Sequence, residues 1–257
     1  MGIAVAIYAL RNVFNDPAIG VPGIIDFLHK QDIDLVELNA LYTQPDKFTE
    51  FAATFVDAGI HPIQVTVDGN NFFAKTESER KAQFAYMKQW IDPAHEVGIP
   101  IVRANMGHRT TLFRRNDTLP NLLETFRPIL DYTESLDMNF VFENHGGRSS
   151  DVNFQLQVKK ALPSPHFGYL LDFGNYKPKS LVYDNIKKLG SSILAVHAKA
   201  YFFDADGNET TLDVGRIIQN LREVGYQGDY NVEFEGQPRL PDFEGTEKTI
   251  QLLRKYL

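Results

Sequence analysis

The sequence contains no cysteine, which excludes disulfide bonds and thiolate metal sites. It also has no excess of positive charge, because 26 lysines and arginines face 33 aspartates and glutamates and the net charge is −7. General electrostatic attraction to nucleic acid needs the opposite balance. We therefore expect no nucleic-acid partner.

Long hydrophobic runs are absent as well. The first apolar run covers residues 3–10, far short of the roughly 20 residues that a membrane-spanning helix needs. No basic residue precedes this run, so it lacks the layout of a signal peptide. Together with the lack of cysteine, these features predict a soluble cytoplasmic protein with no membrane partner.

Short apolar runs alternate with amphipathic stretches along the whole chain. In the stretch after the second run, Phe48, Ala52 and Phe55 recur at the spacing of one helix face. Gly59 and Gly98 each come just before the next run, where a helix commonly ends. The runs that we predict to be strands cover residues 3–9, 35–39, 63–67, 99–104, 139–143, 168–172, 193–198 and 230–234.

Eight strand–helix units in 257 residues are typical of a (β/α)8 TIM barrel, so we predict one such barrel and a single domain over residues 1–257. The starts of the runs are roughly 25–40 residues apart, the length of one strand–helix unit. A doubly wound sheet is the rival fold, and its first turn is normally rich in glycine. The stretch IYALRNVFN, residues 7–15, contains no glycine and therefore favours the barrel.

The last four runs each end in a side chain that can bind a metal. In a barrel, catalytic groups lie at the C-terminal ends of the strands, and neighbouring strands are about 5 Å apart. We therefore expect these side chains at one height around a single divalent ion. Three carboxylates and one imidazole suit Mn²⁺ or Mg²⁺ best, with Co²⁺ and Zn²⁺ as alternatives. The four residues are Glu143, Asp172, His197 and Glu233.

Each of these residues also has an ordinary explanation. A carboxylate at a strand end is often a helix cap or a solvated loop residue, and a lone histidine is often a hydrogen-bonded core residue. The metal site is the better explanation, because the ordinary ones would have to hold independently at four equivalent positions. Glu235 competes with Glu233, since it lies two residues further along the same face of the strand.

Several motifs resemble one known family. FENHGG, LLDFGNY, VHAKAY, GYQGDYNVEFEG and the closing FEGTEKTIQLLRKYL are similar in order and spacing to the xylose isomerase-like TIM barrels, the sugar phosphate isomerases/epimerases. The resemblance covers nearly the whole chain. This family includes tagatose and psicose epimerases, inosose isomerases and dehydratases and, more distantly, endonuclease IV.

The resemblance implies a sugar or keto-sugar isomerase/epimerase that acts on a small sugar or sugar phosphate. One divalent metal would be held by Glu143, Asp172, His197 and Glu233. Glu143 and Glu233 would also move the proton beside a carbonyl, through an enediolate that the metal stabilises. The sequence departs from several epimerases at Asn175, where they carry histidine, and it carries Lys199 two residues after the histidine ligand.

Five further residues are candidates for substrate contacts. Arg103 ends the fourth run, and a structural ion pair explains it equally well. Glu37 and Asn39 close the second run and could instead cap the following helix, whereas Lys199 could meet a substrate oxygen or a phosphate. The basic cluster His108, Arg109, Arg114 and Arg115 is expected to be a solvated loop. The five candidates are Arg103, His145, Lys199, Glu37 and Asn175.

Three other functions remain open from the sequence. A dehydratase or lyase acting on a keto-sugar or keto-inositol would use the same metal and the same base. An apurinic endonuclease is disfavoured, because the resemblance implies three zinc ions and extra histidines that the second and third runs lack. A non-catalytic sugar-binding barrel is the third alternative, and self-association into a homo-oligomer is compatible with all of them.

Overall fold

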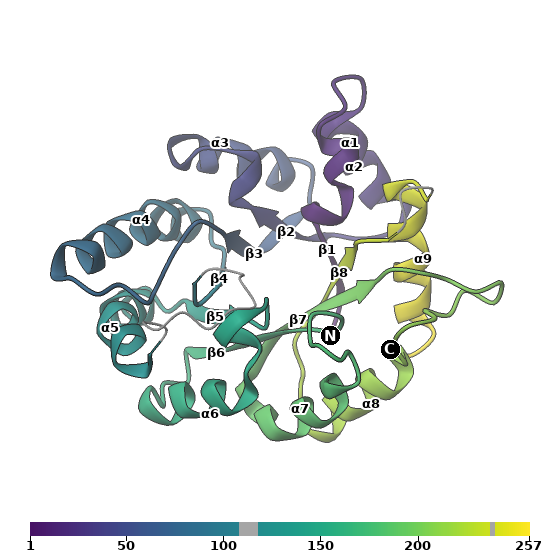
Figure 1. Cartoon of the computed structure of the whole chain (residues 1–257). Coiled ribbons are helices and arrows are strands. Elements are labelled where there is room, and N and C mark those ends of the chain that lie inside the picture. Colours follow the sequence, from purple (N-terminus) through teal and green to yellow (C-terminus); the bar gives the residue numbers. More distant parts are fainter. Residues whose placement is uncertain (108–117, 237–239) are drawn as a thin grey trace.

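Eight parallel strands close into a barrel in which β1 pairs with β8 and every other strand pairs with its neighbours in sequence (Figure 1). The structure is a computed structural model that describes residues 1–107, 118–236 and 240–257. This closed parallel barrel confirms the predicted (β/α)8 fold. The strands are β1 (Ile3–Ala6), β2 (Leu35–Asn39), β3 (His61–Val67), β4 (Ile101–Ala104), β5 (Asn139–Glu143), β6 (Phe167–Asp172), β7 (Ile193–Ala200) and β8 (Tyr230–Phe234).

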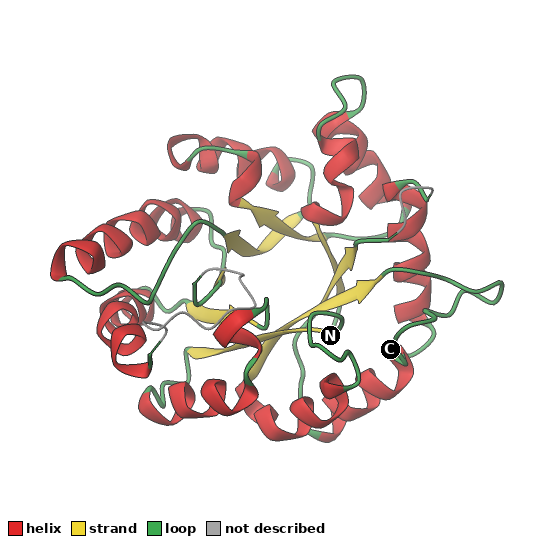
Figure 2. Ribbon diagram, in the orientation of Figure 1, coloured by secondary structure: helices red, strands yellow, loops and turns green. Residues whose placement is uncertain are grey.

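Helices connect the strands and surround the barrel (Figure 2). The helix α4 begins with a capping box, in which Thr76 accepts from the backbone of Glu79 and Glu79 accepts from the backbone of Thr76. Within the described ranges, no helix is long and apolar enough to cross a membrane. The helices are α1 (Arg11–Phe14), α2 (Gly20–Lys30), α3 (Phe48–Val56), α4 (Glu77–Glu96), α5 (Leu119–Ser135), α6 (Val152–Ala161), α7 (Leu181–Leu189), α8 (Val214–Glu223) and α9 (Asp242–Arg254), with short 3-10 helices at Ile7–Leu10, Ala40–Tyr42, Pro45–Lys47, Gly147–Ser150 and Gly190–Ser192.

The strand bounds of β2, β5 and β8 agree with the predicted ranges, whereas the first strand is shorter than expected. Strand β1 ends at Ala6, and the apolar run continues as a buried 3-10 helix over Ile7–Leu10. A fully buried strand and a buried helical turn have the same apolar composition, so the run alone could not separate them. Helix α2 was not predicted, because it begins with Gly20 and contains Pro22, residues that are typical of loops.

The outer faces of the strands pack against the helices. Phe126 of α5 lies among three rings of the barrel, at centroid distances of 4.7 Å from Phe140, 4.5 Å from Phe142 and 5.3 Å from Phe167. All four rings are fully buried, so this cluster fixes α5 against β5 and β6.

The inner faces of the strands form layers, because alternate residues point into the barrel. Val141, Leu170 and Ala195 form a separate apolar cluster, with Ile101 packed against it. Two positions further along the same four strands, the inward residues become polar. The barrel therefore has an apolar floor and an ionisable layer above it, formed on these strands by Arg103, Glu143, Asp172 and His197.

Candidate metal centre

The four predicted metal ligands meet inside the barrel, at the C-terminal end of β5 to β8. Glu143, Asp172, His197 and Glu233 each offer one ligand atom, and these atoms lie within 4.8 Å of one another. All four side chains are buried. Glu235 does not belong to this cluster, and its side chain is 28% exposed. The structure thus brings together the four residues that the sequence placed at strand ends.

We had expected the four residues at one level of the strand register, but they lie at three different levels. Asp172 and His197 are register partners, but Glu143 lies two positions below the level of Asp172 and Glu233 lies two positions above that of His197. Closing a barrel requires tilted, staggered strands. This stagger brings residues from different register positions to one place in space.

Glu37 orients the imidazole of His197 from across the barrel. The Nε2 atom of His197 lies 2.7 Å from Oε2 of Glu37, and since a carboxylate only accepts, Nε2 is the donor. The other ring nitrogen, Nδ1, faces the cluster, 3.1 Å from Oε2 of Glu233 and 3.9 Å from Oδ2 of Asp172. Metal-binding histidines usually donate their second N–H to a carboxylate in this way.

The position of Glu37 differs from the substrate contact or helix cap that the sequence suggested. Its side chain is buried and accepts from Thr66 Oγ1 at 2.6 Å, from Gln64 Nε2 at 2.7 Å and from Asn231 Nδ2 at 3.1 Å. Together with His197, these donors occupy both carboxylate oxygens. Glu37 is therefore placed to position the histidine and not to touch a substrate.

Arg103 and Asn175 hold the carboxylate of Glu143 from two sides. Arg103 Nη2 donates to Oε2 of Glu143, and Asn175 Nδ2 donates to Oε1 at 2.7 Å. Arg103 is 2% exposed and also contacts Asp68 Oδ1 at 3.2 Å. Both residues were expected to bind substrate, but these hydrogen bonds orient Glu143, and for Arg103 the alternative of a structural ion pair describes the geometry.

A cavity of about 390 Å³ opens beside this network, at the ends of β1 to β4. His145 stands between it and Glu143, with Nδ1 2.9 Å from Arg103 Nη2 and 3.2 Å from Oδ1 of Asn105. The polar side chains of the cavity are suited to sugar hydroxyls. It is lined by Tyr8, Leu41, Asp68, Gly69, Asn70, Asn105 and Gly107.

Asp68 and Asn105 were missed by the sequence reasoning, although both follow strand ends. Applying the strand-end rule to β3 and β4 as well as to the last four strands would have found them. The basic cluster of His108, Arg109, Arg114 and Arg115 lies outside the described residues.

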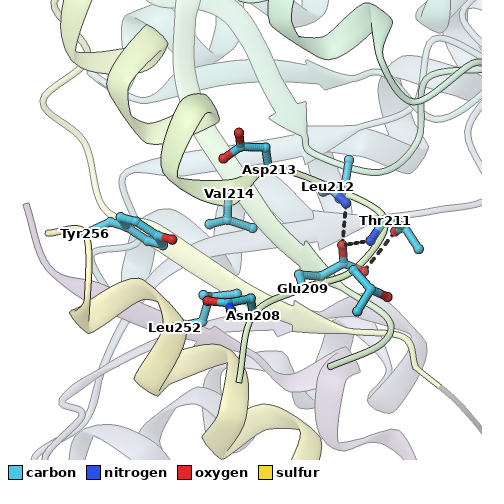
Figure 3. A pocket seen from close by; sticks show the side chains of 9 residues that line it. Asn208, Glu209, Thr211, Leu212, Asp213, Val214, Leu252 and Tyr256 are labelled. Atoms are coloured by element: carbon cyan, nitrogen blue, oxygen red, sulfur yellow. Dashed lines mark hydrogen bonds between the residues drawn. The ribbon is translucent and has the colours of Figure 1, made fainter. Parts of the chain in front are cut away.

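A second cavity, of about 410 Å³, lies between the loop after β7 and the C-terminal residues Leu252 and Tyr256 (Figure 3). Its lining includes Glu209, whose carboxylate accepts from the backbone of Thr211 and Leu212 at 2.5 Å each. This carboxylate therefore holds the loop after β7 together. The cavity contains none of the four metal-capable residues.

The sequence suggested that Lys199 meets a substrate oxygen or a phosphate, whereas in the structure its ammonium is buried among three carboxylates. Its ammonium lies 3.0 Å from Asp172 Oδ2, 2.8 Å from Glu233 Oε2 and 3.0 Å from Glu235 Oε2. Burial alone would lower the pKa of Lys199, but the three carboxylates raise it well above its ordinary value. A lysine that forms a Schiff base needs a neutral amine, so Lys199 is unsuited to that chemistry.

The other ionisable groups of the cluster have strongly shifted pKa values. Burial raises the pKa of Asp172 to about 6, against the opposing effect of Lys199. For Glu233, burial is outweighed by Lys199 and His197, which lower its pKa well below the ordinary value. For His197, burial is outweighed by Glu37 and Glu233, which raise its pKa to about 10. A divalent ion would take the place of the His197 proton, because metal binding releases protons from its ligands.

The donor set fits a divalent ion. Among the described residues, His197 Nδ1, Asp172 Oδ2 and Glu233 Oε2 are buried without a hydrogen bond, although Lys199 lies within ion-pair distance of the two oxygens. These three atoms converge on one place, and the side chains that carry them are of the types that bind divalent ions. A mainly oxygen set with one nitrogen suits Mn²⁺ or Mg²⁺ and also accepts Co²⁺ or Zn²⁺.

Fold and site together define a class: a (β/α)8 barrel with a buried Glu/Asp/His cluster that could hold a metal at the C-terminal end of its strands. Within this class, the chain belongs to the xylose isomerase-like TIM barrel family, whose sequence model matches residues 25–256. The resemblance stated from the motifs is thereby confirmed. No curated protein matches the sequence.

Solved structures of similar fold cover almost the whole chain. An L-ribulose 3-epimerase has a TM-score of 0.80 at 13% identity, over 100% of this chain and 95% of that chain. The probable 3-DHS dehydratase AsbF of Bacillus anthracis, involved in petrobactin synthesis, has a TM-score of 0.73 at 15% identity, over 99% of both chains. The IolI protein with a bound zinc atom has a TM-score of 0.76 at 14% identity, over 100% of this chain and 99% of that chain. At these identities the likeness establishes the fold.

Proposed function

We propose that this protein is a divalent-metal-dependent isomerase or epimerase of a sugar or keto-sugar. The observation that carries the proposal is the convergence of four buried metal-capable side chains, Glu143, Asp172, His197 and Glu233, whose ligand atoms lie within 4.8 Å of one another at the C-terminal end of the barrel strands. An ion held there would act as a Lewis acid and stabilise the enediolate that forms when a proton leaves the carbon beside a carbonyl.

In this proposal the two glutamates move the proton. They are the first and last members of the four-strand series from β5 to β8, and this separation supports roles on different sides of a substrate. The pKa of Glu233 is held low by Lys199 and His197 against the effect of burial, so this carboxylate is ionised and can bind a cation. Arg103 and Asn175 fix Glu143 for the return of a proton.

The neighbouring cavity supplies the rest of a sugar site. Its residues Asp68, Asn70 and Asn105 offer carboxylate and amide groups for the hydroxyls of a small sugar. The family and the L-ribulose 3-epimerase among the similar structures support this substrate class, and the similar structure with a bound zinc atom supports a divalent ion. We accordingly assign the protein to carbohydrate metabolism, with Mn²⁺ or Mg²⁺ as the first candidates for the ion.

The test is deuterium incorporation from heavy water into a panel of keto-sugars, with and without phosphate, in the presence of Mn²⁺. We expect exchange at a carbon beside the carbonyl, because proton abstraction is the first step of the proposed reaction. Protein stripped with EDTA should show none, and the Glu209→Gln variant, changed at a distant buried glutamate, should exchange like the wild type at saturating Mn²⁺.

The products separate the candidate reactions. An epimer or isomer supports the proposal, whereas a product that has lost water or a glycosyl group would make the protein a dehydratase or lyase, as AsbF probably is. Absence of exchange with every sugar, in protein that binds Mn²⁺, would leave a sugar-binding barrel without catalysis and would overturn the proposal.

A further inference from the structure

The ammonium of Lys199 contacts the same two oxygens that face the metal-binding nitrogen of His197. Asp172 Oδ2 lies 3.0 Å from Lys199 Nζ and 3.9 Å from His197 Nδ1. Glu233 Oε2 lies 2.8 Å from Nζ and 3.1 Å from Nδ1. Lysine and histidine therefore converge on one pair of carboxylate oxygens. This arrangement follows from the strand period, because residues 197 and 199 share one face of β7.

An ion that used these two oxygens would lie close to the ammonium. Metal–oxygen distances are about 2.1 Å for Mg²⁺, so an ion on Glu233 Oε2 could be at most about 5 Å from Lys199 Nζ. Both cations would be buried, where the repulsion between charges is weakly screened. The two positive charges therefore oppose each other at the site.

Glu235 offers the ammonium a third partner outside the cluster. Its Oε2 lies 3.0 Å from Lys199 Nζ, and its side chain is 28% exposed. Within the described part of the chain, Glu233 forms an ion pair with His197, whereas Glu235 does not. Glu235 can keep its ion pair with Lys199 when Asp172 and Glu233 bind a divalent ion.

We propose that Lys199 is a counter-cation that competes with the divalent ion for Asp172 and Glu233, and that Glu235 retains the ammonium when the ion binds. The proposal rests on the metal site of the proposed function and adds a residue that sets its affinity. Without the ion, Lys199 compensates the buried carboxylates. With the ion, Lys199 weakens binding and favours exchange of the metal.

The test measures Mn²⁺ affinity by calorimetry and thermal unfolding in EDTA, both independent of turnover. Lys199→Met should bind Mn²⁺ about tenfold or more tightly than the wild type, because the repulsion is gone. The same variant should unfold at a lower temperature in EDTA and gain more from added Mn²⁺. Lys199→Gln, which keeps a donor but no charge, should change affinity in the same direction and serves if the methionine variant does not fold. Lys159→Met is the control, since Lys159 is a half-buried lysine that donates to the backbone at Ser164 and Phe167.

Glu235→Gln should have the opposite effect and bind Mn²⁺ more weakly, because the ammonium loses its alternative partner. In the Lys199→Met background, Glu235→Gln should change Mn²⁺ affinity little further. This result would show that Glu235 acts through Lys199, and not by attracting the ion directly with its own negative charge. Weaker Mn²⁺ binding by both Lys199 variants would show that the lysine orients the ligands, and this would overturn the inference. Failure of the wild type itself to bind Mn²⁺ would refute the metal site and with it the proposed function.

Discussion

Neutralising Glu37 is the sharpest test of how the site is organised. Glu37 accepts four hydrogen bonds, three at Oε2 from Gln64, His197 and Asn231 and one at Oε1 from Thr66. In Glu37→Gln, the amide oxygen can take the place of Oε2 and the amide nitrogen can face the hydroxyl of Thr66, which is able to accept. The network then stays satisfied, and the variant loses mainly the negative charge beside His197.

The structure therefore predicts a moderate effect on folding and a large one on metal binding. Glu37→Gln replaces four charge-assisted hydrogen bonds by neutral ones, and at about 1 kcal/mol for each bond the free energy of unfolding should fall by up to about 4 kcal/mol. For a chain of this size, each kcal/mol is a shift of about 2–4 °C in the unfolding temperature measured with EDTA present. Loss of an outer carboxylate typically lowers metal affinity about 10–100-fold, which equals roughly 1.4–2.7 kcal/mol of binding free energy.

The assay is a Mn²⁺ titration of wild type, Glu37→Gln and Glu209→Gln, with thermal unfolding of each protein in EDTA. Glu209 is the matched control, because it is another buried glutamate that accepts several hydrogen bonds, but in the loop after β7. Glu209→Gln should lose stability and keep its Mn²⁺ affinity. Equal Mn²⁺ affinity of Glu37→Gln and wild type would refute the role of Glu37, as would an equal loss of affinity in both variants.

Three further predictions concern the cluster. His197→Ala should lower Mn²⁺ affinity by more than the about 10–100-fold expected for Glu37→Gln, because it removes the nitrogen ligand. Metal analysis of the wild type should find one ion per chain, and two or three ions at this site would contradict the single-ion hypothesis. Glu233→Gln should abolish solvent exchange into the substrate at saturating Mn²⁺ while Glu235→Gln retains it, and the reverse would shift the assignment by two residues. Asn144→Ala should lower the free energy of unfolding, measured with urea, by about 2–3 kcal/mol, because the Asn144 amide accepts from the backbone N–H of Asp172 at 2.7 Å and donates to its carbonyl at 3.1 Å. An unchanged urea midpoint would show that these hydrogen bonds do not hold β5 to β6.

The sequence was most informative where a side chain is attached to a regular strand. The apolar runs of β5 and β8 end at definite residues, and in a parallel barrel every strand delivers its last inward side chain to the same rim. Glu143 and Glu233 could therefore be assigned to one site before any coordinates. Helices α6 and α7 carried weaker signals, because they are short and open among polar residues, and neither was predicted.

Contacts across the barrel could not be predicted in the same way. Glu37 and His197 are separated by 160 positions and come from strands that do not pair with each other. Whether their side chains meet depends on the stagger of the strands and on side-chain rotamers, which no local pattern records. For the same reason, Arg103 and Asn175 looked like substrate contacts, whereas their position beside Glu143 makes them part of the frame that holds it.

The charges inside the barrel explain why a buried cluster of carboxylates is compatible with the fold. A carboxylate removed from water needs a cation or several donors, or it becomes protonated. Here Arg103 meets Glu143, and Lys199 meets Asp172 and Glu233, so each ligand carboxylate has a protein cation beside it. The apolar layer of Val141, Leu170 and Ala195 lies directly beneath and keeps these charges at the mouth. The protein cations thus allow the carboxylates to be buried together, and the proposed competition predicts that one of these cations, Lys199, also lowers the affinity of the cluster for a metal.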